Sequence, residues 1–224
     1  MKIGVFSDIH GNWPAFKACL KFLEETVDTI YFLGDIFGYM PDGMKILNEL
    51  IKRDIKIVLG NHDAMVLGLL PINPQKEKVY QLLNERKKLT PNLRKYLSNL
   101  PVFDEIEFDN KRLLFAHGSP WNFLLGYVYE NDVNEKFNKL PYDFVFLGHT
   151  HIPFVKRLNI TTVINVGSAG LPRDIGNSSC MTIFDTVSNK ITQSRLNFDE
   201  DYVLELYRGK INESVMNCLK RKKK

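Results

Sequence analysis

The stretch that does most to define the fold is Ile3-Gly4-Val5-Phe6-Ser7-Asp8-Ile9-His10-Gly11-Asn12. Its first four residues are apolar or small, which is typical of a buried β-strand. Asp8 and His10 follow directly, and because they stand two residues apart, both can face the same side of an extended segment. Such an Asp-x-His pair is more often incidental than a metal site, so its meaning depends on the rest of the chain.

The same arrangement recurs at four later places. Apolar runs at 30–33, 55–59, 113–116 and 144–147 lead into Gly34 and Asp35, Asn61 and His62, His117, and His149 and His151. In open α/β sheets, ligands bind at the carboxyl ends of strands, so five adjacent ends would bring imidazoles and carboxylates into one cavity. Nitrogen and oxygen donors without sulfur suit hard or borderline divalent metals. The pattern therefore predicts a hydrolytic metal centre.

Length and charge set simple bounds. The chain has 224 residues with 44% hydrophobic content, enough for one substantial core, and we expect a single domain over residues 1–219. The formal net charge of +4 comes largely from the basic tail at 220–224. Such a tail can contact nucleic acid or an anionic surface, but a solvated, frayed terminus is the simpler interpretation. We do not expect a nucleic-acid partner.

The cysteines and the apolar segments indicate the compartment. Cys19, Cys180 and Cys218 are far apart and lack Cys-x-x-Cys spacing, so neither a disulfide framework nor a thiolate metal site is indicated. The apolar run at the amino terminus is too short for a signal peptide, and no window reaches the ~18 apolar residues of a membrane span. We expect a cytoplasmic protein without a membrane partner.

Helical patterns alternate with the apolar runs in the first hundred residues. Apolar spacing predicts helices over 13–25 and 43–53, and Thr90 as N-cap with Pro91 at the first helical position predicts a third over 90–100. The polar segment 71–88 is compatible with loop or helix. Alternation of strand and helix implies right-handed crossovers and a parallel sheet.

After Pro101 the pattern becomes typical of β-structure. Strand-like runs at 102–108 and 111–116 flank Asp109-Asn110, which is a two-residue hairpin signal. Further strands are predicted at 154–158, 162–166, 180–185 and 191–196, with Ser188-Asn189 as the turn between the last two. We expect a second, mostly antiparallel sheet.

Each candidate ligand also has a structural interpretation. Asp35 follows Gly34, and its carboxylate could bridge two cations, but an aspartate after a strand also serves as an Asx-turn or helix cap. His117 alone is more often a hydrogen-bonded structural residue. His149 and His151 differ, because two imidazoles at this spacing can reach adjacent metal positions.

Gly60-Asn61-His62-Asp63 is a more specific signal. The Asn61 carbonyl is a neutral oxygen ligand, and the adjacent His62 can act as a general acid or charge stabiliser, although a turn leading into a helix is the alternative. The five segments together supply seven donors, namely Asp8, His10, Asp35, Asn61, His117, His149 and His151. Seven are too many for one tetrahedral ion and suit two ions that share Asp35.

These motifs resemble the signature of the calcineurin-like metallophosphoesterases. The resemblance rests on Asp8-x-His10, Gly34-Asp35-x-x-Gly38, Gly60-Asn61-His62-Asp63, His117-Gly118 and Gly148-His149-x-His151, in this order. Gly38-Tyr39-Met40-Pro41-Asp42 and Gly167-Ser168-x-Gly170-x-Pro172-Arg173-Asp174 also resemble the bacterial and archaeal phosphodiesterase branch, often labelled diadenosine-tetraphosphatase-like. That branch usually has proline where this chain has Val166, which removes a rigid turn element but touches no proposed ligand.

The resemblance implies an α/β fold of two facing mixed β-sheets flanked by helices, arranged as a four-layer α/β/β/α sandwich. It further implies one ion held by Asp8, His10 and His151 and a second held by Asn61, His117 and His149, with Asp35 bridging them. Two such ions acidify a shared water to hydroxide and clamp the phosphoryl oxygens during attack. His62 is left to stabilise or protonate the leaving-group oxygen, and Asp63 to hold His62 in place.

Two further features have alternative interpretations. Arg173 can clamp a phosphate through paired hydrogen bonds, or it can form a surface ion pair with Asp174 or another acid. The aromatic residues that follow His117 can stack on a nucleobase, or they can form a small apolar cluster of their own. The residues concerned are Trp121, Phe123, Tyr127 and Tyr129.

The expected activity is metal-dependent hydrolysis of a small phosphodiester, such as a nucleotide. A phosphomonoesterase or protein phosphatase with the same centre is the main alternative, and a non-catalytic scaffold is a third that the complete donor set disfavours. For the ions we expect manganese first, with zinc, iron, nickel and magnesium as alternatives, because all tolerate such donors.

Overall fold

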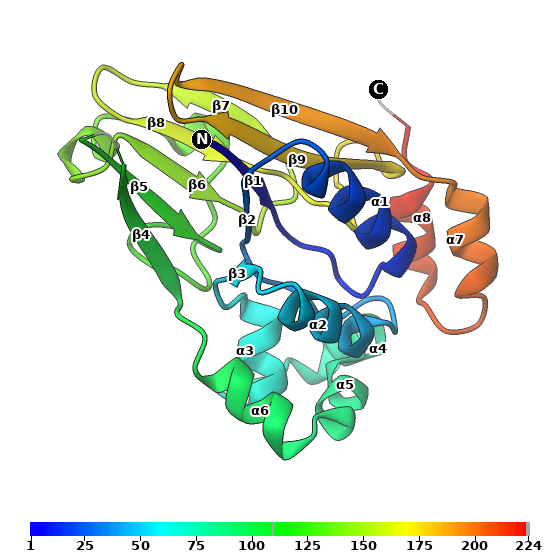
Figure 1. Ribbon diagram of the computed structural model, residues 1–224. Helices are drawn as coiled ribbons and strands as arrows, with labels where there is room; N and C mark the ends of the chain where they lie inside the picture. The colour runs from blue at the N-terminus through cyan, green and yellow to red at the C-terminus, as the bar shows by residue number, and fades with distance from the viewer. Residues whose placement is uncertain (109, 223–224) are drawn as a thin grey trace.

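The computed structural model describes residues 1–108 and 110–222 and contains two five-stranded sheets. The first is built from β1 (Lys2–Phe6), β2 (Thr29–Phe32), β3 (Lys56–Ile57), β9 (Ser178–Asp185) and β10 (Lys190–Asn197). The second is built from β4 (Phe103–Phe108), β5 (Lys111–Ala116), β6 (Phe144–Leu147), β7 (Phe154–Arg157) and β8 (Thr162–Asn165). Their strand orders are β10-β9-β1-β2-β3 and β4-β5-β6-β8-β7 (Figure 1). The predicted two-sheet α/β fold is confirmed.

The three predicted helices are confirmed, and the described residues form others that the sequence left undecided or did not predict. The helices are α1 (Trp13–Glu24), α2 (Gly43–Lys52), α3 (Asn61–Leu67), α4 (Pro74–Tyr80), α5 (Leu82–Lys88), α6 (Pro91–Ser98), α7 (Glu200–Leu206) and α8 (Glu213–Leu219), with 3-10 turns η1 (Glu130–Asp132) and η2 (Phe137–Lys139). Thr90 caps α6 by accepting a hydrogen bond from Leu93 N at 3.3 Å. The undecided segment 71–88 forms α4 and α5, separated by Gln81 in the left-handed region with φ 57°.

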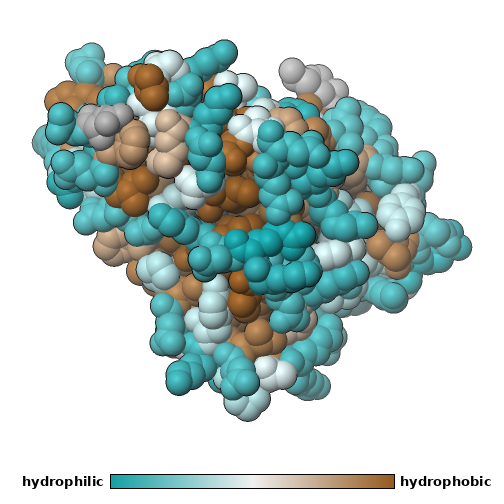
Figure 2. Space-filling model, in the orientation of Figure 1, coloured by the Kyte–Doolittle hydropathy of each residue, from teal (hydrophilic) through white to brown (hydrophobic). Residues whose placement is uncertain are grey.

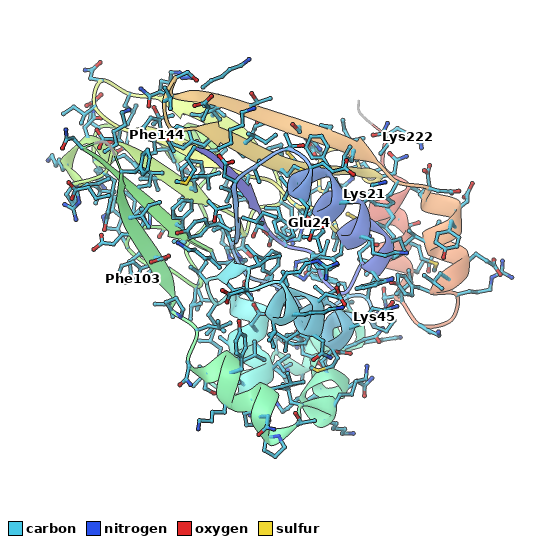
Figure 3. The ribbon with its side chains drawn as sticks, viewed as in Figure 1. Lys21, Glu24, Lys45, Phe103, Phe144 and Lys222 are labelled. Carbon is cyan, nitrogen blue, oxygen red and sulfur yellow. The ribbon has the colours of Figure 1, made fainter. Side chains whose placement is uncertain are left out.

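An apolar core fills the space between the sheets. Ile3 and Val5 of β1 contribute to it from the first sheet, and Phe115 and Phe146 from the second. Phe144, labelled on β6 in Figure 3, meets Phe184 of β9 with ring centroids 4.5 Å apart. Both sheets bury their facing sides, so the strands cannot shift along one another without exposing apolar residues. The strand ends of the two sheets are therefore held in a defined position relative to one another.

The outer faces are covered differently. Phe6 and Phe32 turn away from the inter-sheet core and share a second apolar core with residues of α1, α2, α7 and α8. In Figure 1, α1, α7 and α8 lie beside β9 and β10, and α2 lies below α1. The view in Figure 2 shows mostly hydrophilic side chains, with apolar residues visible in the seams between elements. The second sheet is covered by the irregular segment that carries η1 and η2, through Val128, Val133 and Phe137.

The second sheet corrects one prediction. It is mixed and not mostly antiparallel, because β6 pairs in parallel with both β5 and β8. The β9–β10 hairpin joins the first sheet instead, where β9 runs antiparallel to β1. The connection from β5 to β6 contains only 3-10 turns, so the sequence lacks the helical pattern that usually indicates a parallel connection. Phe108 and Lys111 pair as the predicted hairpin requires, although Asp109 lies outside the described residues.

Val166 stands where the phosphodiesterase branch has proline, and its backbone N–H forms a hydrogen bond. Val166 N donates to Leu147 O at 2.8 Å, a hydrogen bond that proline could not form. The Asn165 side chain closes the turn by accepting from Gly167 N at 2.9 Å. The loop is therefore held by hydrogen bonds in place of a rigid ring.

The carboxyl-terminal residues pack against the body. Gly176 N donates to Arg221 O at 2.8 Å, and Lys222 Nζ lies 2.5 Å from Glu200 Oε1. The expectation of a frayed tail is therefore wrong for residues 220–222, because backbone and ion-pair contacts hold them. Residues 223 and 224 lie outside the described chain. None of the described helices is long and apolar enough to cross a membrane.

Candidate metal centre

The polar strand ends meet at one edge of the two sheets. The loops after β1 and β2 are joined by Asp8 N donating to Gly34 O and His10 N donating to Asp35 O, each at 3.0 Å. The ends of β5 and β6 are joined by Gly148 N donating to His117 O at 3.0 Å. The five strand ends thus belong to two facing sheets and not to one. All seven predicted donors are brought together and buried: Asp8, His10, Asp35, Asn61, His117, His149 and His151.

One group of donors consists of Asp8, His10 and His151. His10 Nδ1 lies 2.9 Å from Phe37 O and His151 Nδ1 lies 2.6 Å from Leu171 O, so each Nδ1 carries the proton and donates to a carbonyl. The two Nε2 atoms are then lone-pair acceptors, yet they face each other at 3.1 Å. Asp8 Oδ1 lies 3.2 Å from His151 Nε2, while Asp8 Oδ2 accepts from the backbone N–H of His149 at 3.0 Å.

A second group repeats this geometry around His117. His117 Nδ1 lies 2.8 Å from Leu33 O, which places a proton on Nδ1 and, when the ring is neutral, leaves Nε2 as an acceptor. That Nε2 faces Asn61 Oδ1 at 2.8 Å and His149 Nδ1 at 3.1 Å. Backbone carbonyls thus aim the Nε2 atoms of three histidines, His10, His117 and His151, at the interior of the site.

Asp35 lies between the two groups. Its Oδ2 is 3.7 Å from His10 Nε2 and 3.4 Å from His117 Nε2, and its Oδ1 accepts from His62 N at 2.8 Å. Three overlapping sets of side chains have ligand atoms close enough to hold a metal ion: Asp8, His10 and His151; His10, Asp35 and His62; and Asp35, His117 and His149. Asp35 is shared by two of them.

The donor set suits divalent cations. When the rings are neutral, the Nε2 lone pairs of His10, His117 and His151 converge on the site, and Asp8 Oδ1 and His149 Nε2 are buried without a hydrogen-bond partner among the described residues. A buried unpaired acceptor costs about 1–3 kcal/mol, and more for a charged group, which a bound cation would remove. Oxygen and imidazole donors without sulfur fit the borderline and hard divalent metals. The residues present therefore fit the metal site that the sequence predicts.

The pKa values of the site residues also indicate that a positive charge would be stabilised there. Burial opposes ionisation of Asp8 and Asp35, but the surrounding histidines outweigh it and hold both carboxyl pKa values below their usual range. Burial lowers the pKa of His117, but the carboxylates of Asp35 and Asp8 prevail and raise it to about 9. Burial lowers the pKa of His149 to about 3. Two carboxylates thus remain charged inside a ring of imidazoles.

The backbone of the ligand loops is strained. Residues with side chains rarely adopt the left-handed region, and each instance costs of order 1–3 kcal/mol. Five of the seven predicted donors adopt it, with φ of 55° at Asp8, 48° at His10, 61° at Asp35, 66° at His149 and 61° at His151. Such strain persists only where the surroundings enforce it, and here it turns consecutive polar side chains toward one point.

Asp63 supports a loop and not the His62 ring. Its carboxylate accepts from Asp35 N at 2.8 Å, Ile36 N at 2.9 Å and Gly60 N at 3.1 Å. The predicted role of Asp63 in holding His62 is therefore corrected. The Asp63 carboxylate accepts hydrogen bonds from backbone N–H groups and so positions the loop that carries Asp35.

His62 stands beside the donor groups. Its ring is 5.2 Å from Tyr39 and 4.6 Å from Tyr80 between centroids, and Nδ1 is buried without a partner among the described residues. A side chain at Gly38 would collide with it, because a Cβ there would lie 2.5 Å from His62 Nδ1. Burial lowers the pKa of His62 to about 3. Because His62 belongs to one of the three sets that could hold an ion, the distances permit coordination as well as catalysis.

We call the seven buried donors the floor of the site, and four side chains above them the rim. A cavity of about 20 Å³ lies over the floor, and the rim residues that line it are Tyr39, Tyr80, Tyr127 and Arg173. The predicted alternative for Arg173 was an ion pair with Asp174 or another acid, but Asp174 pairs with Arg195, and Arg173 has no ion-pair partner among the described residues. Arg173 instead faces the cavity, and its backbone N–H donates to His151 O at 3.3 Å.

The four aromatic residues after His117 separate into two kinds. Trp121 packs on Phe137 at 4.8 Å and Phe123 on Phe103 at 4.4 Å, as an apolar cluster would. Tyr127 instead stacks beside His149 at 4.0 Å and lines the cavity, with Tyr129 next to it. The apolar-cluster interpretation is therefore confirmed for Trp121 and Phe123, whereas nucleobase stacking stays a prediction for Tyr127 and Tyr129.

Sequence reasoning missed three residues near the site. Tyr39 lies in the Gly38–Asp42 motif, which by itself indicates no role for the tyrosine. Tyr80 lies in the polar segment 71–88, which has no apolar periodicity. Tyr207 of the α7–α8 region is buried behind the floor, where its hydroxyl accepts from Trp13 N at 3.1 Å and donates to Asp42 Oδ2 at 2.8 Å. It thereby joins the loop after His10 to the start of α2.

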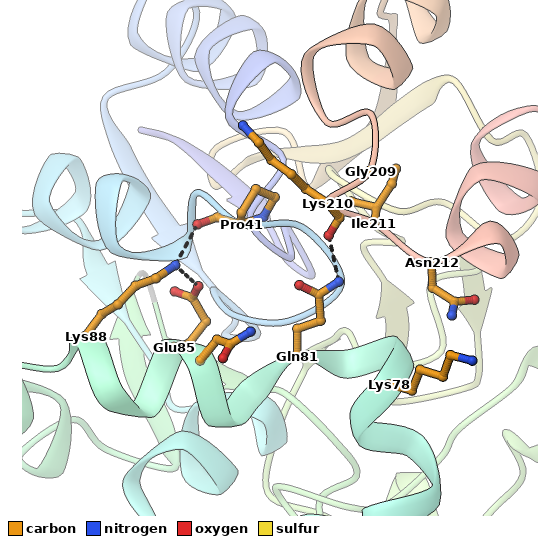
Figure 4. Close-up of a pocket in the computed structure, with 10 residues that line it drawn as sticks. Pro41, Lys78, Gln81, Glu85, Lys88, Gly209, Lys210, Ile211 and Asn212 are labelled. Atoms are coloured by element: carbon orange, nitrogen blue, oxygen red, sulfur yellow. Dashed lines mark hydrogen bonds and ion pairs between the residues drawn. The ribbon is translucent and has the colours of Figure 1, made fainter.

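A larger cavity of about 520 Å³ lies beside the rim, between α5 and the α7–α8 loop (Figure 4). It contains none of the seven donors. Gln81 Nε2 donates to Lys210 O at 2.7 Å across it, and Lys88 Nζ pairs with Glu85 Oε1 at 2.6 Å along one side. Since its charged groups are paired or exposed, we assign the chemistry to the small cavity over the floor.

Residues 1–189 match the calcineurin-like phosphoesterase superfamily domain. An uncharacterized protein of Methanocaldococcus jannaschii is 31% identical over 215 residues, which cover 88% of each chain. A symmetrical bis(5'-nucleosyl)-tetraphosphatase of Buchnera aphidicola is 35% identical over 92 residues, or 39% of this chain and only 30% of that enzyme. The crystal structure of a metallophosphoesterase from Sphaerobacter thermophilus superposes with a TM-score of 0.81 at 25% identity, covering 98% of both chains.

Proposed function

Because the chain belongs to the calcineurin-like phosphoesterase superfamily, it is a phosphoric ester hydrolase, and we propose that it cleaves a small phosphodiester at a centre of two divalent ions. The observation that carries this proposal is the position of Asp35. Its Oδ2 lies between His10 Nε2 and His117 Nε2, at 3.7 and 3.4 Å, so one carboxylate serves two separate groups of acceptors.

We assign one ion to Asp8, His10 and His151 and the other to Asn61, His117 and His149, with Asp35 shared. Two ions in this arrangement would supply Lewis acidity and a nucleophile at neutral pH. Manganese is the first candidate, and zinc, iron, nickel and magnesium are alternatives that the same donors accept. The backbone contacts of His10, His117 and His151 keep their free nitrogens aimed inward without rearrangement.

His62 and Arg173 complete the assignment. His62 is placed at the cavity wall, where it can stabilise the charge that develops on the leaving oxygen. The Arg173 guanidinium has no ion-pair partner among the described residues and lines the same cavity, so it can bind a non-bridging phosphate oxygen. Asp63 acts indirectly, by holding the backbone that presents Asp35.

The lining of the cavity and the relatives favour a small substrate. Three tyrosines and one arginine surround the opening over the floor, which does not suit the open groove that a protein phosphatase needs. Relatives named bis(5'-nucleosyl)-tetraphosphatases support a nucleotide as the substrate class, although the match covers a minority of the Buchnera enzyme. A non-catalytic scaffold is disfavoured, because all seven donors and His62 are present and converge.

We also propose that residues 1–219 form a single domain. The segment after residue 189, where the family match ends, does not stand apart. Its Val203, Tyr207 and Val215 belong to the same apolar core as α1 and α2.

The test compares hydrolysis of bis-p-nitrophenyl phosphate with that of p-nitrophenyl phosphate. Metal-stripped protein is refilled with Mn²⁺ and then with each alternative ion, and Asp35→Asn serves as control. Faster cleavage of the diester that requires both metal and Asp35 supports the proposal. Preference for the monoester would favour the phosphomonoesterase alternative, and metal binding without hydrolysis of either ester would contradict both.

A further inference from the structure

We infer that Tyr127 and Tyr129 form a slot for the planar base of a nucleoside attached to the scissile phosphate. This inference rests on the proposed function, since it concerns the substrate of the same site. The two rings are nearly parallel, with an interplanar angle of 10° and centroids 6.2 Å apart. They are also exposed, Tyr127 to 53% and Tyr129 to 42%. The other two rings of this loop have aromatic partners in the apolar cluster, since Phe123 packs on Phe103 and Trp121 on Phe137.

The spacing follows from the backbone. Residues two apart in an extended segment point to the same side and lie about 6.6 Å apart. Val128, between the tyrosines, is buried in the core outside the second sheet and anchors the segment. A flat ring held between two others requires contact of about 3.5 Å on each side, or about 7 Å in all, so the two tyrosine rings must move apart from their centroid distance of 6.2 Å to admit a base.

The slot is connected to the floor. The Tyr127 ring lies beside His149, a predicted metal ligand, with centroids 4.0 Å apart and the planes tilted by 38°, and it is nearly parallel to the Tyr129 ring. Tyr127 also lines the cavity together with Arg173. A phosphate bound to the floor and to Arg173 would therefore have its nucleoside directed along the loop toward the two tyrosines.

The loop is rigid enough to present the rings before substrate binds. Gly118 N donates to Phe123 O, Ser119 N to Asn122 O and Gly126 N to Asn122 O, at 2.6, 2.9 and 3.0 Å. Gly126 is packed so closely that a Cβ would lie 2.1 Å from Ser119 Oγ. Preorganisation reduces the entropy lost on binding, and stacking is tolerant of sequence because every base has a π-face. The slot should accept purines and pyrimidines alike.

The experiment compares thymidine 5'-(p-nitrophenyl phosphate) with methyl p-nitrophenyl phosphate. The two esters release the same leaving group, so the ratio of their kcat/KM values reports nucleoside recognition alone. We expect the wild-type protein to prefer the nucleoside ester by at least about tenfold, and Tyr127→Leu or Tyr129→Leu to lower this ratio about tenfold. Tyr129→Phe keeps the π-face and should retain the preference. Trp121→Leu is the matched control, because Trp121 is 56% exposed in the same loop but packs on Phe137.

A binding measurement separates failure of this inference from failure of the proposed function. Binding of thymidine 5'-monophosphate to the metal-loaded protein is followed by equilibrium dialysis, for the wild type and the Leu variants. Equal rates on both esters would overturn the slot while leaving a phosphodiesterase intact. If neither ester is cleaved, saturable binding that is weakened by Tyr129→Leu but not by Trp121→Leu supports the slot, and its absence overturns it.

Discussion

The floor of the site is fixed by main-chain contacts between strand-end loops, whereas the rim is assembled from side chains of four separate segments. Floor residues such as His10 and His151 each donate a ring N–H to a backbone carbonyl, and they are held in left-handed backbone conformations. Two of the rim residues lack this support: Tyr80 ends α4, in which no residue is buried, and Tyr127 is half exposed. The floor is thus built to keep one geometry, and the rim has room to vary with substrate.

Replacing Asp35 tests the floor most severely. Asp35→Asn keeps an oxygen that can accept from His62 N, so the loop should fold, but the shared negative charge is lost. Metal-ion catalysis is worth several kcal/mol, so hydrolysis of a diester should fall on the order of 10³-fold or more. Metal analysis by inductively coupled plasma mass spectrometry should show fewer than two ions per chain. Full metal content together with full activity would remove Asp35 from the floor.

Replacing His62 tests where the floor ends. His62→Ala should lower kcat on the diester by roughly 10²–10⁴-fold while both ions remain bound, because the ring is assigned to the leaving oxygen and not to a metal. The comparison of metal content between His62→Ala and wild type is decisive here. A lost ion would mean that His62 belongs to the floor with His10 and Asp35, as one of the three candidate sets allows.

The same division explains what the sequence could predict. Each floor residue follows an apolar run that forms a strand, and the register of two sheets buried on their facing sides brings the ends together. The predicted ligands are therefore found at one point even though one sheet was expected to be mostly antiparallel. Tyr80 carried no such signal, because its place depends on a tertiary contact, Tyr39 N donating to Tyr80 O at 2.9 Å. The parallel pairing of β6 with β5 and β8 could not be predicted either, because the segments that connect these strands contain no α-helix.

Arg173 tests whether the rim binds substrate. Arg173→Ala should raise KM for a phosphodiester by about tenfold with a smaller change in kcat, because a charge-assisted hydrogen bond to phosphate is lost. Arg195→Ala is the matched control: Arg195 pairs with Asp174 away from the cavity, so it can lower stability without changing KM. Equal KM values for Arg173→Ala and wild type would show that the rim arginine does not contact the phosphate.

The smallest effect is expected behind the floor, at Tyr207. Its hydroxyl bridges Trp13 N and Asp42 Oδ2, which tie the loop after His10 to α2, and this contact comes from the segment beyond the family match. Tyr207→Phe removes the bridge but keeps the buried ring, so the free energy of unfolding should fall by about 1 kcal/mol. If the floor is held as rigidly as its backbone contacts indicate, kcat should change less than about threefold, because the hydrogen bonds from His10 N and Gly11 N to the Asp35 loop remain. Tyr202→Phe, an exposed tyrosine of α7, controls for loss of a hydroxyl alone. A drop in kcat at Tyr207 that approaches the effect of His62→Ala would show that the carboxyl-terminal helices are required to position the floor.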